Sequence, residues 1–347
     1  MNVNGKNYRT IWMEDSAVCM IEQNLLPFEF SIVRLSSLEA TCRAIRDMTV
    51  RGAGAIGAAA GYAMAQYFEG AFETPNMDAL QARKMIEGTR PTARNLFYAV
   101  ERVFDKGLAS PGLAREEAER IANEDADCSS RIGEYGVGLI RKEMRIMTHC
   151  NAGWLAFVDY GTALSPIYKA AELGLDPFVY VGETRPRSQG ARLTAWELNL
   201  AGIRHSIIPD TAAAWIMSRN MVDLVITGAD RIARNGDTAN KIGTLDRAVL
   251  AREFNIPFYI AAPFSTFDLN CTRGNDIPIE LRNEEEVHYQ TGPDESGTMR
   301  TIRVSSPGST ALNFAFDVTP ARLITGFITE KGIIKPEESE ILKYFYL

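Results

Sequence analysis

Short apolar runs alternate with helical segments through the second half of the chain, and this alternation constrains the fold more than any other feature. The runs lie at 145–148, 178–181, 205–208, 224–227 and 257–261, and each ends at a polar turn. Their length is typical of strands rather than of helices. Strands that alternate with helices indicate a parallel, doubly wound sheet. A further run at 323–328 could add a late strand, for which an antiparallel direction is considered.

The first part of the chain has a different pattern. Residues 1–35 carry short alternating patches that predict a small antiparallel β piece. Ser36 and Ser37 then precede a helical pattern, which is the position of an N-cap. Residues 113–143 indicate one long helix or a broken pair of helices. We therefore expect an α/β protein with a small N-terminal α+β domain at 1–135 and a parallel-sheet catalytic domain at 136–347.

Composition excludes several classes of function. The net charge of −7 argues against a nucleic-acid surface, and no apolar run is long enough to cross a bilayer. The N-terminus lacks a secretion signal, so a cytoplasmic protein is expected. The five cysteines are scattered without a CxxC pair, and there are three histidines. This pattern gives no zinc signature, and neither a metal nor a cofactor is expected.

Polar groups gather where the predicted strands end. In parallel sheets ligands bind beyond the carboxyl ends of the strands. Those ends carry Cys150, residues 183–189, Asp210, residues 230–237 and the Asn240-Lys241 pair, with a helix expected from about Thr238. Five separate segments thus deliver reactive or polar groups to one edge, which favours a functional site there.

Each of these groups has a structural alternative. Cys150 could be a thiol activated by N–H dipoles or a cation, or equally a buried structural thiol. Asp230 could be a general acid or base, or it could cap the next segment. Asn240 and Lys241 suit an anion or sugar hydroxyls, whereas a lysine on a helix face is often only solvated.

The glycine-rich segment at 50–68 could hold an anion. Arg51 stands at the mouth of a turn into a helix, and Arg90 could make a second anion contact, although a lone arginine is more often a surface residue. The P-loop, dinucleotide and GxSxG patterns are absent. A thiol, a carboxyl and anion-binding cations fit proton transfer on a phosphorylated small molecule.

Several long motifs resemble one known family, the methylthioribose-1-phosphate isomerases, which are related to regulatory subunits of a translation-initiation exchange factor. The similarity extends over almost the whole chain, and its motifs are VRGAGAIG, THCNAG, GETRPRSQGARLTAWEL, TGADRIARNGDTANKIGT and FDVTPARLITGFITEKGIIKP.

The resemblance implies a Rossmann-like second domain, a homodimer, and isomerisation of 5-methylthioribose 1-phosphate in methionine salvage without metal or cofactor. It implies a catalytic pair, Cys150 and Asp230, which the regulatory relatives lack. The substrate contacts that it implies are Arg51, Gly52, Ala53, Arg90, Gln189, Asn240 and Lys241.

Two departures from the family pattern bear on specificity. Gly54 stands where the family usually has proline, which predicts a looser turn beside the phosphate site. Residues 154–159 are bulkier than is usual, so the group at sugar C5 is left open. The alternatives are another C1-phosphorylated pentose, such as 5-deoxyribose 1-phosphate or ribose 1,5-bisphosphate, or a regulatory subunit that senses a sugar phosphate or nucleotide without turnover.

Overall fold

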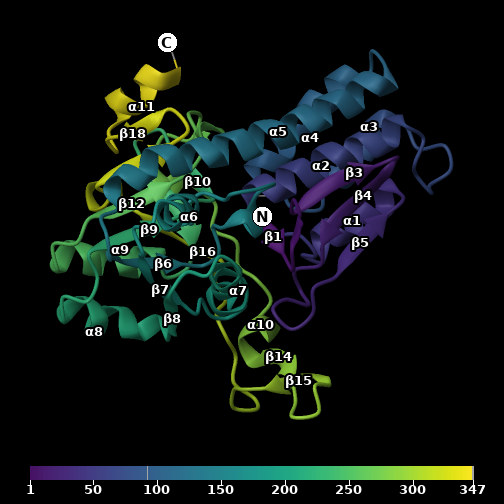
Figure 1. Ribbon diagram of the computed structural model, residues 1–347. Helices are drawn as coiled ribbons and strands as arrows, with labels where there is room; N and C mark the ends of the chain where they lie inside the picture. Colours follow the sequence, from purple (N-terminus) through teal and green to yellow (C-terminus); the bar gives the residue numbers. More distant parts are fainter. Residues whose placement is uncertain (92, 346–347) are drawn as a thin grey trace.

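The computed structural model describes residues 1–91 and 93–345. The N-terminal part is mainly helical, and a mixed sheet with flanking helices forms the C-terminal part (Figure 1). In the part of the chain described, no helix combines the length and apolar character needed to cross a membrane.

A seven-stranded sheet lies at the centre of the C-terminal part, in the order β18-β17-β12-β9-β6-β7-β8. All of its pairings are parallel except that between β17 and β18, so the predicted doubly wound sheet is confirmed. The late strand runs parallel to β12 and begins at Gly326, so the antiparallel direction considered for it was wrong. The strands are β6 (Arg145–His149), β7 (Phe178–Gly182), β8 (His205–Ile208), β9 (Leu224–Thr227), β12 (Phe258–Ala261), β17 (Gly326–Thr329) and β18 (Gly332–Ile334).

Helices cover both faces of this sheet because successive side chains of a strand point to opposite sides. Ile146 and Val179 pack in one apolar cluster with α6 (Ser165–Glu172) and α7 (Ala195–Leu200). The next residues along the strands, Met147 and Tyr180, pack with α8 (Ala213–Ser218) and α9 (Thr244–Glu253) in another. Both faces are therefore buried, as the continuous apolar runs predict.

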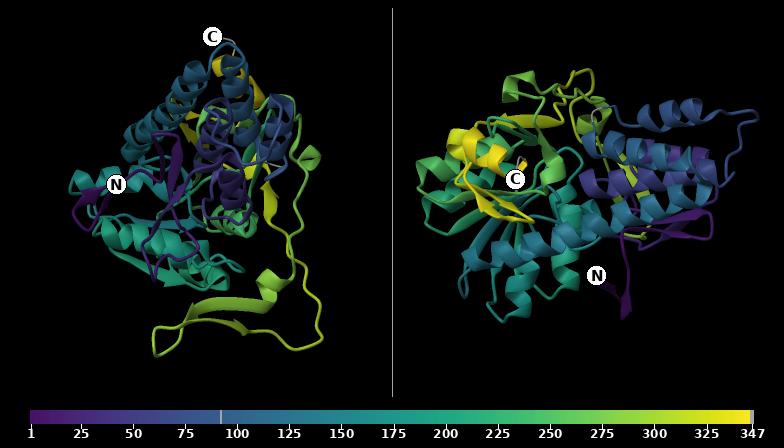
Figure 2. Two further views of the ribbon diagram at one scale, coloured as in Figure 1. Left: turned by 90° about the vertical axis from the view of Figure 1, so that its right-hand side faces the viewer. Right: turned by 90° about the horizontal axis from the view of Figure 1, so that it is seen from above.

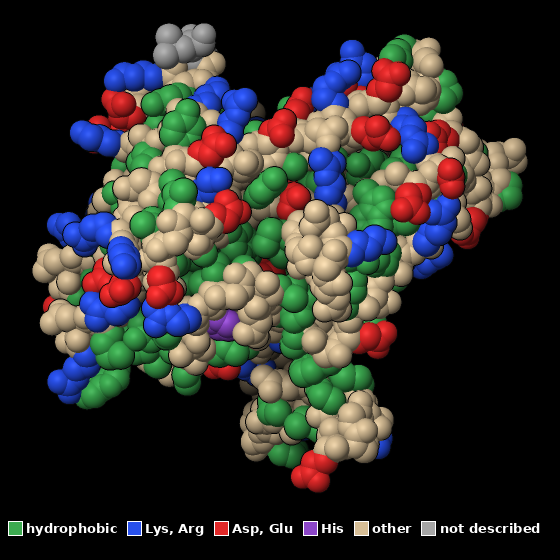
Figure 3. Space-filling model, in the orientation of Figure 1, with side chains coloured by type: hydrophobic (Ala, Val, Ile, Leu, Met, Phe, Trp, Pro, Cys, Tyr) green, Lys and Arg blue, Asp and Glu red, His purple; other side chains and the backbone are tan. Residues whose placement is uncertain are grey.

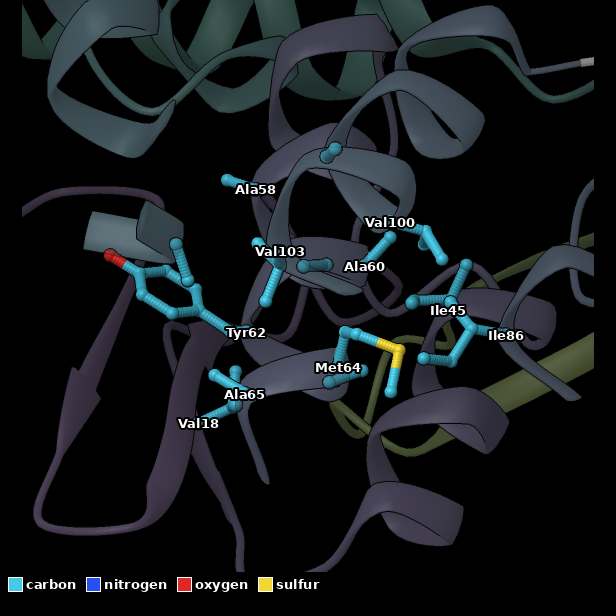
Figure 4. Close-up of a cluster of buried hydrophobic side chains, with 14 of the residues drawn as sticks. Val18, Ile45, Ala58, Ala60, Tyr62, Met64, Ala65, Ile86, Val100 and Val103 are labelled. Atoms are coloured by element: carbon cyan, nitrogen blue, oxygen red, sulfur yellow. The ribbon is translucent and has the colours of Figure 1, made fainter. Parts of the chain in front are cut away.

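The N-terminal part combines an antiparallel sheet with five helices, of which one is buried among the other four. Ser37 caps the first helix as predicted, accepting from Ala40 N. In the second helix every residue from Gly54 to Gln66 is buried, and Figure 4 shows its Ala58, Ala60 and Met64 among side chains of neighbouring helices. The elements are β3 (Ile11–Glu14), β4 (Ala17–Ile21), β5 (Ile32–Leu35), α1 (Leu38–Arg46), α2 (Ala53–Phe68), α3 (Ala79–Glu87), α4 (Arg94–Gly107) and α5 (Pro111–Gly136).

Helix α5 joins the two parts (Figures 1 and 2). Ala114 and Ala122, in its first half, belong to the N-terminal apolar cluster, whereas Ile132, near its end, belongs to the cluster under the sheet. Of the two alternatives for 113–143, one long helix or a broken pair, the structure shows one long helix, which ends at Gly136. The domain division at 135/136 stays a prediction, and it coincides with the end of this helix.

A second, four-stranded sheet corrects one prediction. The helix expected from about Thr238 is a buried strand, β11 (Thr238–Lys241), which pairs with β10 (Arg231–Ala233) and β16 (Phe316–Thr319). The fourth strand is β13 (Phe267–Asp268). Helix α9 starts only after Gly243, whose φ of 97° requires a glycine. The partner strand β16 is far away in sequence, so local pattern does not reveal the pairing.

A β-hairpin arm projects from the body between β13 and β16 (Figures 1 and 2). It contains α10 (Glu285–His288), β14 (Tyr289–Pro293) and β15 (Met299–Arg303). The two ends of the arm, 280–282 and 313–315, are its roots. Two backbone hydrogen bonds join them: Arg282 N donates to Asn313 O at 2.8 Å, and Ala315 N donates to Glu280 O at 2.9 Å. On the face seen in Figure 3, acidic and basic side chains are interspersed over the body. The remaining elements are β1 (Asn2–Val3), β2 (Lys6–Asn7) and α11 (Glu338–Phe345).

Candidate active site

One cavity lies where the start of α2 faces the carboxyl ends of β6 and β9. The structure brings all nine residues singled out from the sequence into its lining, and their roles remain predictions. They are Arg51, Gly52, Ala53, Arg90, Cys150, Gln189, Asp230, Asn240 and Lys241. Among the other lining residues are Arg282, Thr162, Phe157 and Phe316.

The N-terminal wall of the cavity suits an anion. Gly52 has a φ of 89°, and a Cβ there would lie 2.3 Å from Cα of Ala156, so only glycine fits this turn. Within the described chain no side chain caps α2, which leaves its first N–H groups open to a ligand. Burial, with Arg187 and Arg192 nearby, lowers the pKa of Arg51 to about 9, so it is cationic at neutral pH.

Three buried polar atoms on the cavity lack a hydrogen-bond partner among the described residues. They are Nε of Arg51, Oε1 of Gln189 and Oγ1 of Thr162, each from a residue that lines the cavity. Buried polar atoms in native proteins are nearly always paired, so unpaired ones that share a cavity indicate a ligand. The resemblance implied Arg51 and Gln189; Thr162 was missed, because a threonine in a loop carries no distinguishing sequence signal.

Cys150 lies directly after β6 in an unusual backbone conformation. Its φ is 62°, in the left-handed region that costs a non-glycine residue about 1–3 kcal/mol. Cys150 N donates to Thr184 Oγ1 at 2.8 Å, and Thr194 Oγ1 donates to Cys150 O at 2.7 Å. Burial raises the pKa of the thiol, and the charge of Lys241 opposes that rise. The thiol is thus protonated until a base accepts its proton.

Asp230 follows β9 and faces the same space. Its backbone N donates to Ala239 O at 2.9 Å, which ties it to β11. Burial raises the pKa of its carboxyl above the ordinary value, while the charges of Lys241, Arg282 and Arg90 lower it. A raised pKa suits a carboxyl that must donate a proton.

Lys241 and Asn240 come from the end of β11. Lys241 Nζ donates to Ala315 O at 2.9 Å and lies 4.6 Å from the centre of the Phe316 ring. Burial and then Arg282 lower the pKa of Lys241. Asn240 Nδ2 donates to Thr244 Oγ1 at 2.9 Å, which fixes the amide at the start of α9.

Arg282 is a cavity cation that sequence reasoning missed. It comes from the root of the arm, where it is paired with Glu280 at 3.1 Å and lies 5.7 Å from the Phe316 ring. Phe316 therefore contacts two cations, Lys241 and Arg282. The segment around Arg282 has neither strand nor helix periodicity, so nothing in the sequence marks it as part of a site.

The two departures from the family pattern meet in the structure. Gly54 lies in the first turn of α2, and a Cβ there would come within 2.2 Å of Asp125 Oδ1 and 2.5 Å of Phe157 Cδ1. The looser turn predicted at Gly54 was therefore wrong, because this position is tightly packed. Phe157 lines the cavity, as does Ala156, whereas Trp154 is fully buried in the apolar cluster beneath.

Glu197 supports the turn that follows Cys150. It is fully buried and accepts from Asn151 Nδ2 at 2.7 Å, Trp154 N at 2.9 Å and Tyr168 Oη at 2.5 Å. Burial raises its pKa to about 7, while these donors oppose the rise. The sequence offered no reason to separate Glu197 from the other acidic residues of helices.

Residues 49–336 match the family described as the initiation factor 2 subunit family. The methylthioribose-1-phosphate isomerase of Methylobacterium nodulans is 45% identical over 361 residues, covering 99% of this chain and 98% of that protein. The corresponding isomerase of Chloroflexus aurantiacus is 47% identical, covering 94% of this chain and 95% of that protein.

Solved structures agree with these relatives. The crystal structure of 5-methylthioribose 1-phosphate isomerase from Pyrococcus horikoshii superposes with a TM-score of 0.86 at 40% identity, covering 98% of this chain and 96% of that one. Subunit delta of translation initiation factor eIF-2B from A. fulgidus gives 0.81 at 36% identity, covering 97% and 100%. The chain therefore belongs to the initiation factor 2 subunit family and, within it, to the methylthioribose-1-phosphate isomerases.

Proposed function

We propose that this protein converts 5-methylthioribose 1-phosphate into 5-methylthioribulose 1-phosphate, an aldose–ketose isomerisation of methionine salvage. The observation that carries the proposal is the shared cavity, which unites Cys150 and Asp230 with an anion-binding helix start at Arg51. The full-length relatives named as this isomerase support the same activity.

Ring opening requires an acid, because the anomeric oxygen is esterified by phosphate. Asp230 in its protonated form donates to the ring oxygen while the bond from that oxygen to C1 breaks, leaving positive charge at C1. The raised pKa of Asp230 supports this role. The phosphate is held by Arg51 and the first N–H groups of α2, with Lys241 as a further cation.

Hydrogen then moves from C2 to C1 by one of two balanced routes. In the first it moves as a hydride, and the C2 hydroxyl returns its proton to Asp230. In the second, Asp230 first takes the proton of Cys150, and the thiolate removes the C2 proton to give an enol. The thiol then delivers a proton to C1, and the C2 hydroxyl gives its own proton to the resulting thiolate as the ketone forms. In both routes the thiol and the carboxyl end protonated, as they began.

Turnover in D2O separates the two routes. Product without deuterium at C1 would support the hydride route, and deuterium at C1 would support proton transfer through Cys150. The measurement is the proton NMR spectrum of the product.

The cavity wall bears on the choice among substrates. Met48, Ile56, Phe157, Ile277 and Pro278 give it an apolar lining that suits a methylthio group better than a second phosphate. The purified protein should therefore convert 5-methylthioribose 1-phosphate faster than 5-deoxyribose 1-phosphate and much faster than ribose 1,5-bisphosphate. Product formation from each is followed by NMR. Failure to convert any of the three would refute the enzyme and support a sensing subunit.

We also propose a cytoplasmic homodimer. Exposed apolar side chains on the arm and its roots, Leu281, Ile302 and Leu312, support self-association. Light scattering at several concentrations should give twice the mass of one chain, and a constant single-chain mass would exclude the dimer.

A further inference from the structure

The backbone of Cys150 is held from two sides by hydroxyl groups. Its N–H donates to Oγ1 of Thr184, and its carbonyl accepts from Oγ1 of Thr194. Both threonines are fully buried. The two bonds bracket the one residue of this turn whose φ of 62° is unfavourable for a side chain of its type.

Thr184 occupies a position that normally disfavours threonine. Its own φ is 66°, and a β-branched residue with such a φ is a genuine outlier. Glycine or asparagine would fit this backbone at lower cost, but glycine has no side-chain acceptor at all. The hydroxyl accepts from Cys150 N and donates to Gly182 O at 2.9 Å, so both of its functions are used.

An ion pair between Asp210 and the buried Arg247 holds Thr184 in place. Asp210 accepts from Thr184 N at 3.0 Å and from Arg185 N at 2.8 Å. Arg247, 1% exposed, donates to the same carboxylate at 2.7 Å. The loop end that carries the first hydroxyl is therefore fixed independently of Cys150.

Thr194 closes the π-helical turn Gly190–Thr194, a rare element that occurs often at functional sites. Its hydroxyl also accepts from Asn151 Nδ2 at 3.1 Å, so it fixes two consecutive residues of the turn. Gln189, the predicted substrate contact, immediately precedes this element. The segment 184–194 thus carries the predicted substrate contact Gln189 and both threonines that hydrogen-bond to the backbone of Cys150.

We propose that Thr184 and Thr194 are positioning residues that lock Cys150 into its left-handed conformation and so keep its thiol at the cavity. This proposal rests on the proposed function only for its effect on turnover. The lock itself is a property of the protein and is testable without substrate.

The turnover test compares Thr194→Val and Thr184→Val with Thr194→Ser and Thr184→Ser in the full-length protein. Valine keeps the shape and removes the hydroxyl, whereas serine keeps the hydroxyl. Each valine variant should lower kcat on the order of tenfold to a hundredfold with KM changed less than about twofold, because the thiol is misplaced while the phosphate contacts remain. Each serine variant should recover most of kcat.

Thr329→Val serves as the matched control. Thr329 is also fully buried and donates to a backbone carbonyl, Gly332 O at 2.7 Å, but it ends β17, beside the edge strand β18, and does not line the cavity. Its variant should lose stability as the others do, measured by thermal unfolding, with unchanged kcat. Equal kcat losses in all three valine variants, or no recovery by serine, would overturn the proposal.

Alkylation of Cys150 by iodoacetamide, followed by peptide mass spectrometry, tests the lock without substrate. Release of the backbone exposes the thiol, so both valine variants should be alkylated at least several-fold faster than the wild type and the Thr329→Val variant. Unchanged alkylation in both would refute the lock. Faster alkylation in a protein that converts no sugar phosphate would refute only the proposed function.

Discussion

The two walls of the cavity differ in what they contribute. The N-terminal wall presents Arg51, Arg90 and the uncapped start of α2, all of which suit a fixed negative charge. The C-terminal wall presents Cys150 and Asp230, whose pKa values are both raised by burial. The N-terminal wall is thus equipped to bind a phosphate, whereas the C-terminal wall carries the two groups that can exchange protons, together with the further cation Lys241.

This division explains how one scaffold could serve both turnover and sensing. The cations of the cavity suit a sugar phosphate, and the thiol and carboxyl of the C-terminal wall are the groups that suit proton transfer. We therefore expect mutations of Cys150 or Asp230 to change mainly kcat, and mutations of Arg51 to change mainly KM.

The largest effect is expected on the C-terminal wall. Cys150→Ser and Asp230→Asn should each lower kcat by about 10²–10⁴-fold with little change in KM, because both residues act on the proton transfers. Steady-state kinetics provides the measurement, with Cys271→Ser as a cysteine control outside the cavity. If either variant chiefly raised KM, its residue would act in substrate binding rather than in proton transfer.

On the N-terminal wall, Arg51→Gln should weaken substrate binding by about 1.5–3 kcal/mol, since a charge-assisted hydrogen bond to phosphate is lost. The loss should appear in KM and in weaker competitive inhibition by inorganic phosphate. Arg204→Gln, which removes an exposed arginine paired with Asp176, should change neither. A loss confined to kcat would contradict the assignment of Arg51 to binding.

Asp125 supports the N-terminal wall and should make stability depend on pH. Burial raises the pKa of its carboxyl to about 7, above that of the unfolded chain. The folded state therefore binds more protons at weakly acidic pH, so the unfolding free energy falls as pH rises towards 7. Relative to the wild type, Asp125→Asn should gain roughly 2–3 kcal/mol between pH 5 and pH 8, because it no longer ionises.

Chemical denaturation at both pH values gives this difference. Asparagine can still accept from Val158 N, which Asp125 does at 2.7 Å, so the hydrogen bond is not the variable. Parallel stability profiles for the wild type and the variant would show that Asp125 does not titrate in this range.

The smallest effect is expected at the apolar boundary between the walls. Phe157→Ala should reduce the preference for a methylthio over a hydroxyl group at C5 by about tenfold, the size of a lost apolar contact. The ratio of kcat/KM for the two substrates is the measurement, and Phe97→Ala on the exposed side of α4 is the control. An unchanged ratio would place the C5 group away from Phe157.

The sheet and much of the site could be predicted because their signals are local. Each apolar run marks its own strand, and the polar groups after β6 and β9 converge because parallel strands end at one edge. Arg51 and Gly52 were expected for the same reason, since a glycine-rich turn into a helix is visible within a few residues.

The failures have non-local causes. Strand β11 was taken for a helix because its pairing depends on β16, which lies beyond the arm. Arg282 reaches the cavity only through the tied roots of that arm. Gly54 packs against Asp125 and Phe157, which belong to two other, distant segments of the chain. The sequence therefore showed that Gly54 departs from the family pattern, but it did not show that close packing is the reason.

Helix α5 has a mechanical consequence. It runs without interruption from the N-terminal apolar cluster to the cluster under the sheet, and Asp125 on it accepts a bond from the residue after Phe157. A continuous helix resists bending, so α5 holds the two walls of the cavity at a fixed separation. We therefore expect substrate to enter by local displacement of the arm and its neighbouring loops, and the gap between the two halves to stay constant through the catalytic cycle.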